Sequence, residues 1–301
     1  MNRRNGLYIS VIAALLLAVA GWYGYSFWLD AVTPDAFNGQ QALADVQAQV
    51  AFGPRTPGSE GHARVQAWIV AELESAGWAV EIQSSERMGH PVENIVARRG
   101  DESPEIILGA HYDTRFFADQ DPNPANHNQP VPGANDGGSG VAVLLELART
   151  LPADSVPTWL VFFDAEDNGQ IEGWDWILGS RAFVEQNPTL RPRAVVIVDM
   201  VGDADLNLYL ERNSTAAIRD EIWAVAAELG YGEVFIQEEK YSMLDDHTPF
   251  LEAGLPAVDI IDFDYPSWHT VQDTPDKVSA ESLEAVGATL LQWLTQQKRQ
   301  R

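Results

Sequence analysis

The sequence contains no cysteine, and this absence limits the chemistry that the chain can perform. Disulfides and thiolate nucleophiles are excluded, so any metal ion must be held by His, Asp and Glu. Basic residues are also scarce, since 19 Lys and Arg stand against 44 Asp and Glu, a formal net charge of -25. A surface of that sign repels phosphate backbones, and we therefore expect no nucleic acid partner.

Charged residues are absent from one stretch near the start, Leu7–Leu29. Arg3 and Arg4 precede this stretch, and Trp and Tyr side chains gather towards its end. A run of about 20 apolar residues is long enough to cross a bilayer, and flanking basic residues remain on the cytoplasmic side. We therefore expect a cytoplasmic tip at 1–6, a single-pass membrane anchor at 7–29 and an extracytoplasmic remainder. The alternative is a signal peptide cleaved at Ala18–Ala20, which would give a secreted protein.

The remainder divides into a linker at 30–40 and a domain at 41–301 in which short apolar runs recur. These continuous runs are Glu105–Ala110, Thr158–Asp164, Arg193–Asp199 and Pro256–Ile261. Such runs are typical of central strands covered on both faces, and alternating segments at 78–84 and 92–98 are typical of half-buried strands. Helical patterns occur at 60–76, 141–149, 216–229 and 280–296. Strands that alternate with helices predict a three-layer α/β/α sandwich with a mostly parallel mixed central sheet.

Polar side chains follow these apolar runs at the point where each predicted strand ends. They are His111, the acids Asp164, Glu166 and Asp167, then Asp199 and, after the last run, His269. Asp136 lies in a glycine-rich turn before the helix predicted at 141–149. Ligands of open α/β sheets bind beyond the carboxyl ends of the strands, so we expect these groups to meet at one edge. Singly, each residue is typical of a cap or a solvated charge, but imidazole and carboxylate groups together suit zinc.

Five short motifs carry a resemblance to a known family. They are GAHYD, PGANDGGSG, FFDAED, IVDMVGD and WHT, in this order along the chain. The ordered set resembles the zinc-dependent aminopeptidase superfamily that also contains the animal-type glutaminyl cyclases. The resemblance extends from about Gly53 to Leu294, and it implies the same α/β sandwich that the apolar runs predict.

The resemblance implies a role for each of the groups at the strand ends. The metal ligands common to both branches of the family match Asp136, Asp167 and His269. The partners that hold a second zinc in the aminopeptidases match His111 and Asp199, with Asp136 as the bridging ligand. Glu166 matches the catalytic general acid and base. The sequence departs from the cyclases at Asp167, where they usually have Glu, and the shorter side chain is expected to shift the metal.

Several segments favour the cyclase branch of this family. HYDTRFF and LDDHTPFLEAGLPA resemble cyclase sequences. Trp268 stands directly before the expected ligand His269, as in the cyclases. In that branch one zinc would polarise the γ-amide of an N-terminal Gln, and Glu166 would carry a proton from the attacking amine to the departing ammonia. Asp245 and Asp199 would adjust the pKa of Glu166 through a shared hydrogen-bond network. Trp268 and Trp174 would contact the substrate.

The peptidase branch is the alternative, and the GGSG that follows Asp136 is more typical of it. In that branch two zinc ions would hold a water molecule that Glu166 deprotonates for attack on the first peptide bond. Both branches act on the N-termini of peptides or proteins. A third interpretation is a non-catalytic, membrane-anchored ectodomain. Such a protein would be expected to have lost metal ligands, whereas every ligand position here carries His or an acid.

Overall fold

The computed structural model describes residues 36–297, and the anchor or signal peptide expected at 7–29 lies outside them. Within the described residues, no helix is both long enough and apolar enough to cross a membrane. The first helix is α2 (Gly39–Ala51). Asn38 caps it, because its side chain accepts hydrogen bonds from the backbone N–H groups of Gln40 and Gln41.

A six-stranded sheet lies at the centre of the fold, in the order β1-β2-β4-β3-β5-β8. Its strands are β1 (Ala79–Arg87), β2 (His90–Arg98), β3 (Ile106–His111), β4 (Thr158–Phe163), β5 (Ala194–Asp199) and β8 (Ala257–Ile261). β3 is parallel to β4 and β5, and β5 is parallel to β8. β2 is antiparallel to both β1 and β4. Met88 and Gly89 join β1 to β2, and both have positive φ, as a tight hairpin turn requires. The expected mostly parallel mixed sheet is therefore confirmed.

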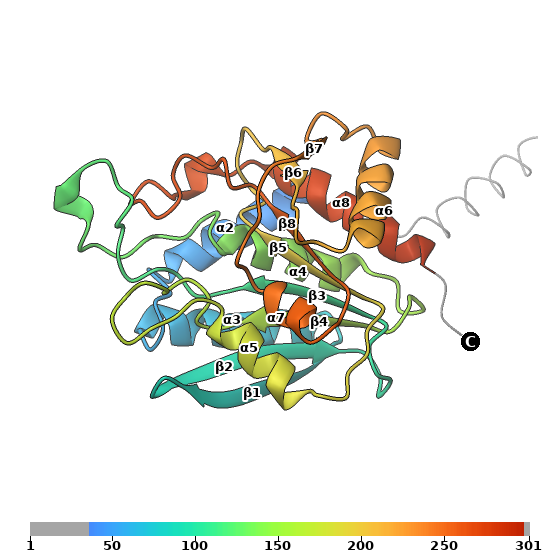
Figure 1. Cartoon of the computed structure of the whole chain (residues 1–301), viewed down its shortest axis with the longest axis horizontal. Helices are drawn as coiled ribbons and strands as arrows, with labels where there is room; N and C mark the ends of the chain where they lie inside the picture. Colours follow the sequence, from blue (N-terminus) through green and yellow to red (C-terminus); the bar gives the residue numbers. More distant parts are fainter. Residues whose placement is uncertain (1–35, 298–301) are drawn as a thin grey trace, which may run out of the picture. The chain divides into compact units, whose positions relative to one another are not determined.

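Helices cover both faces of this sheet (Figure 1). The larger core cluster joins one face to α2, α3 (Glu60–Ser75), α4 (Gly138–Thr150), α6 (Ala216–Glu228) and α8 (Ala280–Gln296). The smaller cluster joins the other face to α5 (Leu178–Gln186) and α7 (Thr248–Glu252). Successive residues of β3 show the division, since Ile106 and Leu108 belong to the larger cluster and Ile107 to the smaller. The fold is thus the three-layer sandwich expected from the sequence.

Several short elements have no counterpart among the sequence-based expectations. They are α5, α7, the paired strands β6 (Leu208–Leu210) and β7 (Phe235–Glu239), and the 3-10 turns η1 (Pro124–Asn126) and η2 (Pro275–Lys277). Most are too short to produce a recognisable hydrophobic period. The long segment Thr114–Gly133 forms a loop, and η1 lies within it.

The register of the parallel strands places their carboxyl ends at one edge of the sheet. His111 ends β3 and pairs with Phe163, which ends β4. Asp199 ends β5 and pairs with Ile261, which ends β8. Residues that follow β4 and β8 therefore emerge beside His111 and Asp199, and α4 starts next to them directly after the Asp136 turn.

Candidate metal centre

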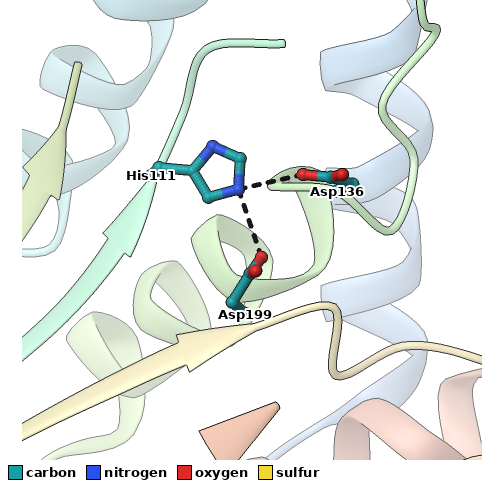
Figure 2. A group of neighbouring side chains, drawn as sticks. All are labelled: His111, Asp136 and Asp199. Carbon is teal, nitrogen blue, oxygen red and sulfur yellow. Dashed lines mark hydrogen bonds and ion pairs between the residues drawn. The ribbon is translucent and has the colours of Figure 1, made fainter. Parts of the chain in front are cut away.

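Two groups of potential metal ligands meet at this edge and share Asp136. Oδ1 of Asp136 and Oδ1 of Asp199 each lie 3.1 Å from His111 Nε2. Figure 2 shows this nitrogen directed at both carboxylates. The other oxygen of Asp136, Oδ2, lies 3.6 Å from His269 Nε2. The same His269 nitrogen lies 2.7 Å from Asp167 Oδ1. The structure therefore brings together all five residues that the sequence suggests as ligands, with Asp136 facing both histidines.

The donor atoms of these groups fit a zinc ion. Asp167 Oδ2 is buried and has no hydrogen-bond partner among the described residues. Leaving such an atom unpaired costs about 1–3 kcal/mol, and a bound cation would satisfy it. His111 Nδ1 lies 3.5 Å from Asp113 Oδ1, the arrangement in which a carboxylate orients a metal-binding imidazole. Nitrogen and carboxylate donors without thiolates are a common zinc set.

The backbone next to the ligands is held in conformations that non-glycine residues rarely adopt. Ala165, Met200 and His269 have φ values of 53°, 47° and 53°. Each such residue costs about 1–3 kcal/mol, which the surrounding packing must offset. Ala165 directly precedes Glu166, and Met200 directly follows Asp199. The sharp turns thus coincide with the residues that carry the polar groups of the site.

Asp113 holds the segment that carries Glu166. Its carboxylate accepts hydrogen bonds from the backbone N–H groups of Glu166 at 2.9 Å and Asp167 at 3.4 Å, and from Asn168 Nδ2 at 3.1 Å. Asp113 follows β3 and Glu166 follows β4, so these bonds join the ends of two adjacent strands. The position of the Glu166 backbone is therefore fixed independently of any metal.

Asp273 holds the turn that carries Asp136. Its carboxylate accepts hydrogen bonds from the backbone N–H groups of Asn135 at 2.8 Å and Asp136 at 3.1 Å. The hydroxyl of Tyr265 donates a third bond to it at 2.7 Å. Asn135 and Asp273 are separated by 138 residues, so no local pattern in the sequence could have indicated this role.

Arg55 holds the same turn from another side. Its buried guanidinium donates to the carbonyl groups of Tyr112 at 3.2 Å, Pro132 at 2.9 Å and Gly133 at 2.5 Å. Burial lowers the pKa of Arg55 to about 10, so it remains positively charged at neutral pH. This side chain therefore places a fixed cation beneath the acidic site and anchors the chain just before Asp136.

Burial and crowding change the protonation of the acids. Burial raises the pKa of Glu166 well above its usual range; His111 opposes this shift and Asp245 adds to it. Burial also raises the pKa of Asp167 to about 6. For His111, burial acts to lower the pKa, but neighbouring carboxylates, Asp199 foremost, outweigh it and raise the pKa. The cluster therefore retains protons that a divalent cation would displace on binding.

A cavity of about 200 Å³ opens onto both ligand groups. Glu166 and Asp245 lie on its wall together with the ligands. Trp268 packs against His269 with ring centroids 3.9 Å apart, and Trp176 lies on the same imidazole at 6.0 Å, both nearly parallel to it. Six residues that the sequence suggests lie outside the group Asp136, Asp167 and His269. Four of them, Glu166, Asp199, Asp245 and Trp268, line this small cavity, whereas His111 and Trp174 do not.

Trp174, the other tryptophan expected to contact a substrate, is placed elsewhere. It stacks on His90 with ring centroids 3.8 Å apart and also contacts Phe116. It is not among the residues that line the cavity, whereas Trp176 is. The loop that contains both tryptophans has no regular periodicity, so the sequence could not indicate which of them faces inwards. The guanidinium of Arg115 lies over the Trp176 ring, 5.0 Å from its centroid, within the range of a cation–π contact.

Comparisons with known proteins agree with this geometry. A model of peptidase family M28 matches residues 94–294. The crystal structure of Tannerella forsythia glutaminyl cyclase is 36% identical, has a TM-score of 0.82 and covers 87% of this chain and 100% of its own. A Zn-dependent exopeptidase from Parabacteroides distasonis is 32% identical, has a TM-score of 0.81 and covers 88% of this chain and 100% of its own. The glutaminyl-peptide cyclotransferase-like protein of Bos taurus is 28% identical over an alignment of 262 residues, which covers 73% of this chain and 66% of that protein. The resemblance that the five motifs carry is confirmed.

Proposed function

The chain belongs to peptidase family M28, a family of enzymes, and from this membership and the geometry of the site we propose that it is a zinc-dependent glutaminyl-peptide cyclotransferase. The observation that carries the proposal is the small aromatic cavity in which Glu166 and Asp245 lie beside both ligand groups. The glutaminyl cyclases among the similar structures, including that of Tannerella forsythia, support it. The substrate is an N-terminal Gln of a peptide or protein.

One zinc ion would be held by Asp136, Asp167 and His269. When bound there, zinc supplies a Lewis acid that polarises a carbonyl group. His111 and Asp199 then act as a hydrogen-bonded pair next to the ion, because Nε2 and Oδ1 are already 3.1 Å apart. Asp167 is shorter than the Glu usual in cyclases, and its Oδ1 nevertheless lies 2.7 Å from the His269 nitrogen.

Glu166 carries the proton in the proposed reaction. The α-amine nitrogen of the substrate attacks the γ-carbonyl carbon, the bond from this carbon to the amide nitrogen breaks, and ammonia leaves. Glu166 accepts the proton that the amine loses and donates it to the departing nitrogen. Its raised pKa suits both steps, and its burial in the cavity excludes water. Asp245 and Asp199 line the same cavity, and repulsion between like charges raises the free energy needed to ionise a further acid there.

Trp268 and Trp176 hold the substrate in the reactive conformation. An intramolecular cyclisation depends mainly on alignment, since both reacting groups belong to one residue. The two indoles come from separate segments of the chain, and both stack on the imidazole ring of His269. Their flat faces would confine the side chain of the Gln next to the ligand groups and keep water from hydrolysing its amide.

A di-zinc aminopeptidase is the second candidate, and one observation favours it. Each oxygen of Asp136 faces a different histidine, as a ligand that bridges two metal ions would. With His111 and Asp199 as ligands of a second zinc, Glu166 would take a proton from a water molecule for attack on the first peptide bond. The number of metal ions per chain therefore separates the two candidates.

We further propose that residues 7–29 tether the enzyme to the cell membrane with the catalytic domain outside the cytoplasm. The support is the uncharged run itself, with Arg3 and Arg4 before it. The full-length chain is then recovered in the membrane fraction and released only by detergent. A soluble chain that starts near Gly21 would identify the segment as a cleaved signal peptide.

The proposed activity is tested with the purified full-length chain in detergent. Ammonia release from a peptide that begins with Gln is measured before chelation, after chelation and after zinc is added back. We expect activity to disappear on chelation and to return with zinc, at about one zinc per chain. Full activity in a metal-free preparation would contradict the zinc assignment, and two zinc ions per chain would favour the aminopeptidase.

A further inference from the structure

A second buried polar cluster lies behind the cavity wall, outside the ligand groups. It contains His247, Asp259 and Glu211, whose side chains are each at most 1% exposed. His247 precedes α7, Asp259 lies in the middle of β8, and Glu211 follows β6. Three distant segments of the chain thus meet at one imidazole.

The imidazole of His247 lies between two carboxylates. Its Nε2 is 3.6 Å from Glu211 Oε2, and its Nδ1 is 3.6 Å from Asp259 Oδ2. At these distances the contacts are longer than hydrogen bonds, and neither nitrogen of His247 and neither oxygen of Asp259 has a hydrogen-bond partner among the described residues. Ligand atoms of His247, Asp259 and Asp245 lie within 4.8 Å of one another, close enough for a single ion. An ion takes only one nitrogen of an imidazole, however, and here the two nitrogens face different acids. The arrangement is that of a histidine that links two carboxylates.

Glu211 connects this histidine to the cavity. Its Oε1 accepts a hydrogen bond from the backbone N–H of Met243 at 2.9 Å, and its Oε2 accepts two from Ser214 at 2.7 and 2.8 Å. The side chain of Asn213 donates to the carbonyl of Met243 at 3.0 Å, so Met243 is held through both its backbone N–H and its backbone C=O. Met243 and the two residues after it, which end with Asp245, line the cavity. The position of this wall therefore depends on the orientation of the Glu211 carboxylate.

We propose that His247 is a positioning residue that fixes the cavity wall Met243–Asp245 by orienting Glu211 on one side and Asp259 on the other. It touches no substrate. Burial lowers the pKa of His247 to about 4 and raises that of Asp259, which favours a neutral imidazole beside a protonated acid. The two contacts have different consequences, because only Glu211 bonds to the wall.

Three substitutions at this position separate the two contacts. The amide of Gln extends to the place of Nε2, so His247→Gln keeps a donor for Glu211 and loses the contact with Asp259. The amide of Asn extends only to the place of Nδ1, so His247→Asn keeps the contact with Asp259 and loses that with Glu211. His247→Leu removes both contacts, so that Asp259 loses its only polar neighbour among these three side chains while Glu211 keeps its bonds to Ser214 and Met243. Leu290→Ala, in the core side of α8, serves as a control that destabilises the fold without touching the cavity.

The test measures kcat/KM of the full-length enzyme, zinc content and thermal stability for each variant. Because a displacement of about 1 Å in an active site can cost on the order of 10²-fold, we expect a loss of that order for His247→Leu with zinc retained. His247→Gln should retain more activity than His247→Asn, and Leu290→Ala should lose stability but keep kcat/KM at temperatures where it is folded.

The inference rests on the proposed function only in needing a measurable peptide activity, so the wild-type enzyme is assayed first. If the wild type acts on neither Gln- nor Leu-peptides, the proposed function fails. The thermal stability of the variants then tests the inference, and equal melting temperatures of the wild type and the Gln, Asn and Leu variants would overturn it. If the wild type is active, equal activities of the Gln and Asn variants, or an unchanged Leu variant, would overturn the positioning role. A metal equivalent that the wild type binds and His247→Gln has lost would overturn it too, because the cluster would then be a metal site.

Discussion

Arg55 offers the sharpest test of how the site is held in place. Its guanidinium donates to three buried carbonyl groups, those of Tyr112, Pro132 and Gly133. Lysine at this position has one ammonium group at the end of a flexible stem and cannot reach three carbonyls spread around a planar fork. Hydrogen bonds from charged groups contribute about 1.5–3 kcal/mol each. Loss of two of the three predicts that Arg55→Lys lowers the free energy of unfolding by about 3–6 kcal/mol.

The assay is urea unfolding of the metal-free protein, followed by zinc titration. Because Gly133 is three residues before Asp136, a loosened turn should also weaken zinc binding. Arg64→Lys is the matched control, since Arg64 is exposed on α3 and pairs with Glu60 on the same helix. We expect that exposed pair to contribute less than about 0.5 kcal/mol. Unchanged stability and zinc affinity for Arg55→Lys would refute the claim that this side chain anchors the turn.

Three further predictions concern the proton carrier, the two tryptophans and a buried histidine outside the cavity. Glu166→Gln should keep zinc and lose turnover by on the order of 10²-fold, whereas Asp167→Asn should lose zinc; the opposite pattern in metal analysis would exchange their roles. Trp176→Ala should lower kcat/KM strongly and Trp174→Ala little, and equal effects in steady-state kinetics would contradict the placement of the two rings. Burial acts to lower the pKa of His62, but the ion pair of its Nε2 with Asp164 Oδ1, at 2.7 Å, outweighs burial and raises this pKa. The resulting stabilisation is present below about pH 6.5 and is lost as the pH rises through the folded pKa, so the melting-temperature difference between wild type and His62→Gln should be larger at pH 6 than at pH 9.

The sequence predicts the central sheet well because its parallel strands are continuous apolar runs that are buried almost throughout. The run that becomes β5 ends with Asp199 in both the pattern and the structure, and the same holds for the helix at Ala280–Gln296. Convergence of the polar groups at one edge also follows, since it needs only parallel strands and the known place of ligands in such sheets. β6 and α7 escape prediction because three and five residues carry no measurable period.

What the sequence does not contain is the identity of distant partners. The contact of Arg55 with Gly133 spans 78 residues, and no spacing rule connects them. The same limitation applies to His247 and its two acids, which come from separate elements. The choice between Trp174 and Trp176 depends on the path of an irregular loop, which propensities do not determine.

The central claim concerns the reaction, and one measurement addresses it most directly. The full-length chain, loaded with zinc, is incubated with two peptides that differ only in their first residue, Gln or Leu, and all products are identified by mass. The account predicts that the Gln-peptide loses one ammonia and keeps every residue, while the Leu-peptide is unchanged. Release of free leucine, with no loss of ammonia from the Gln-peptide, would contradict the account and identify the chain as an aminopeptidase.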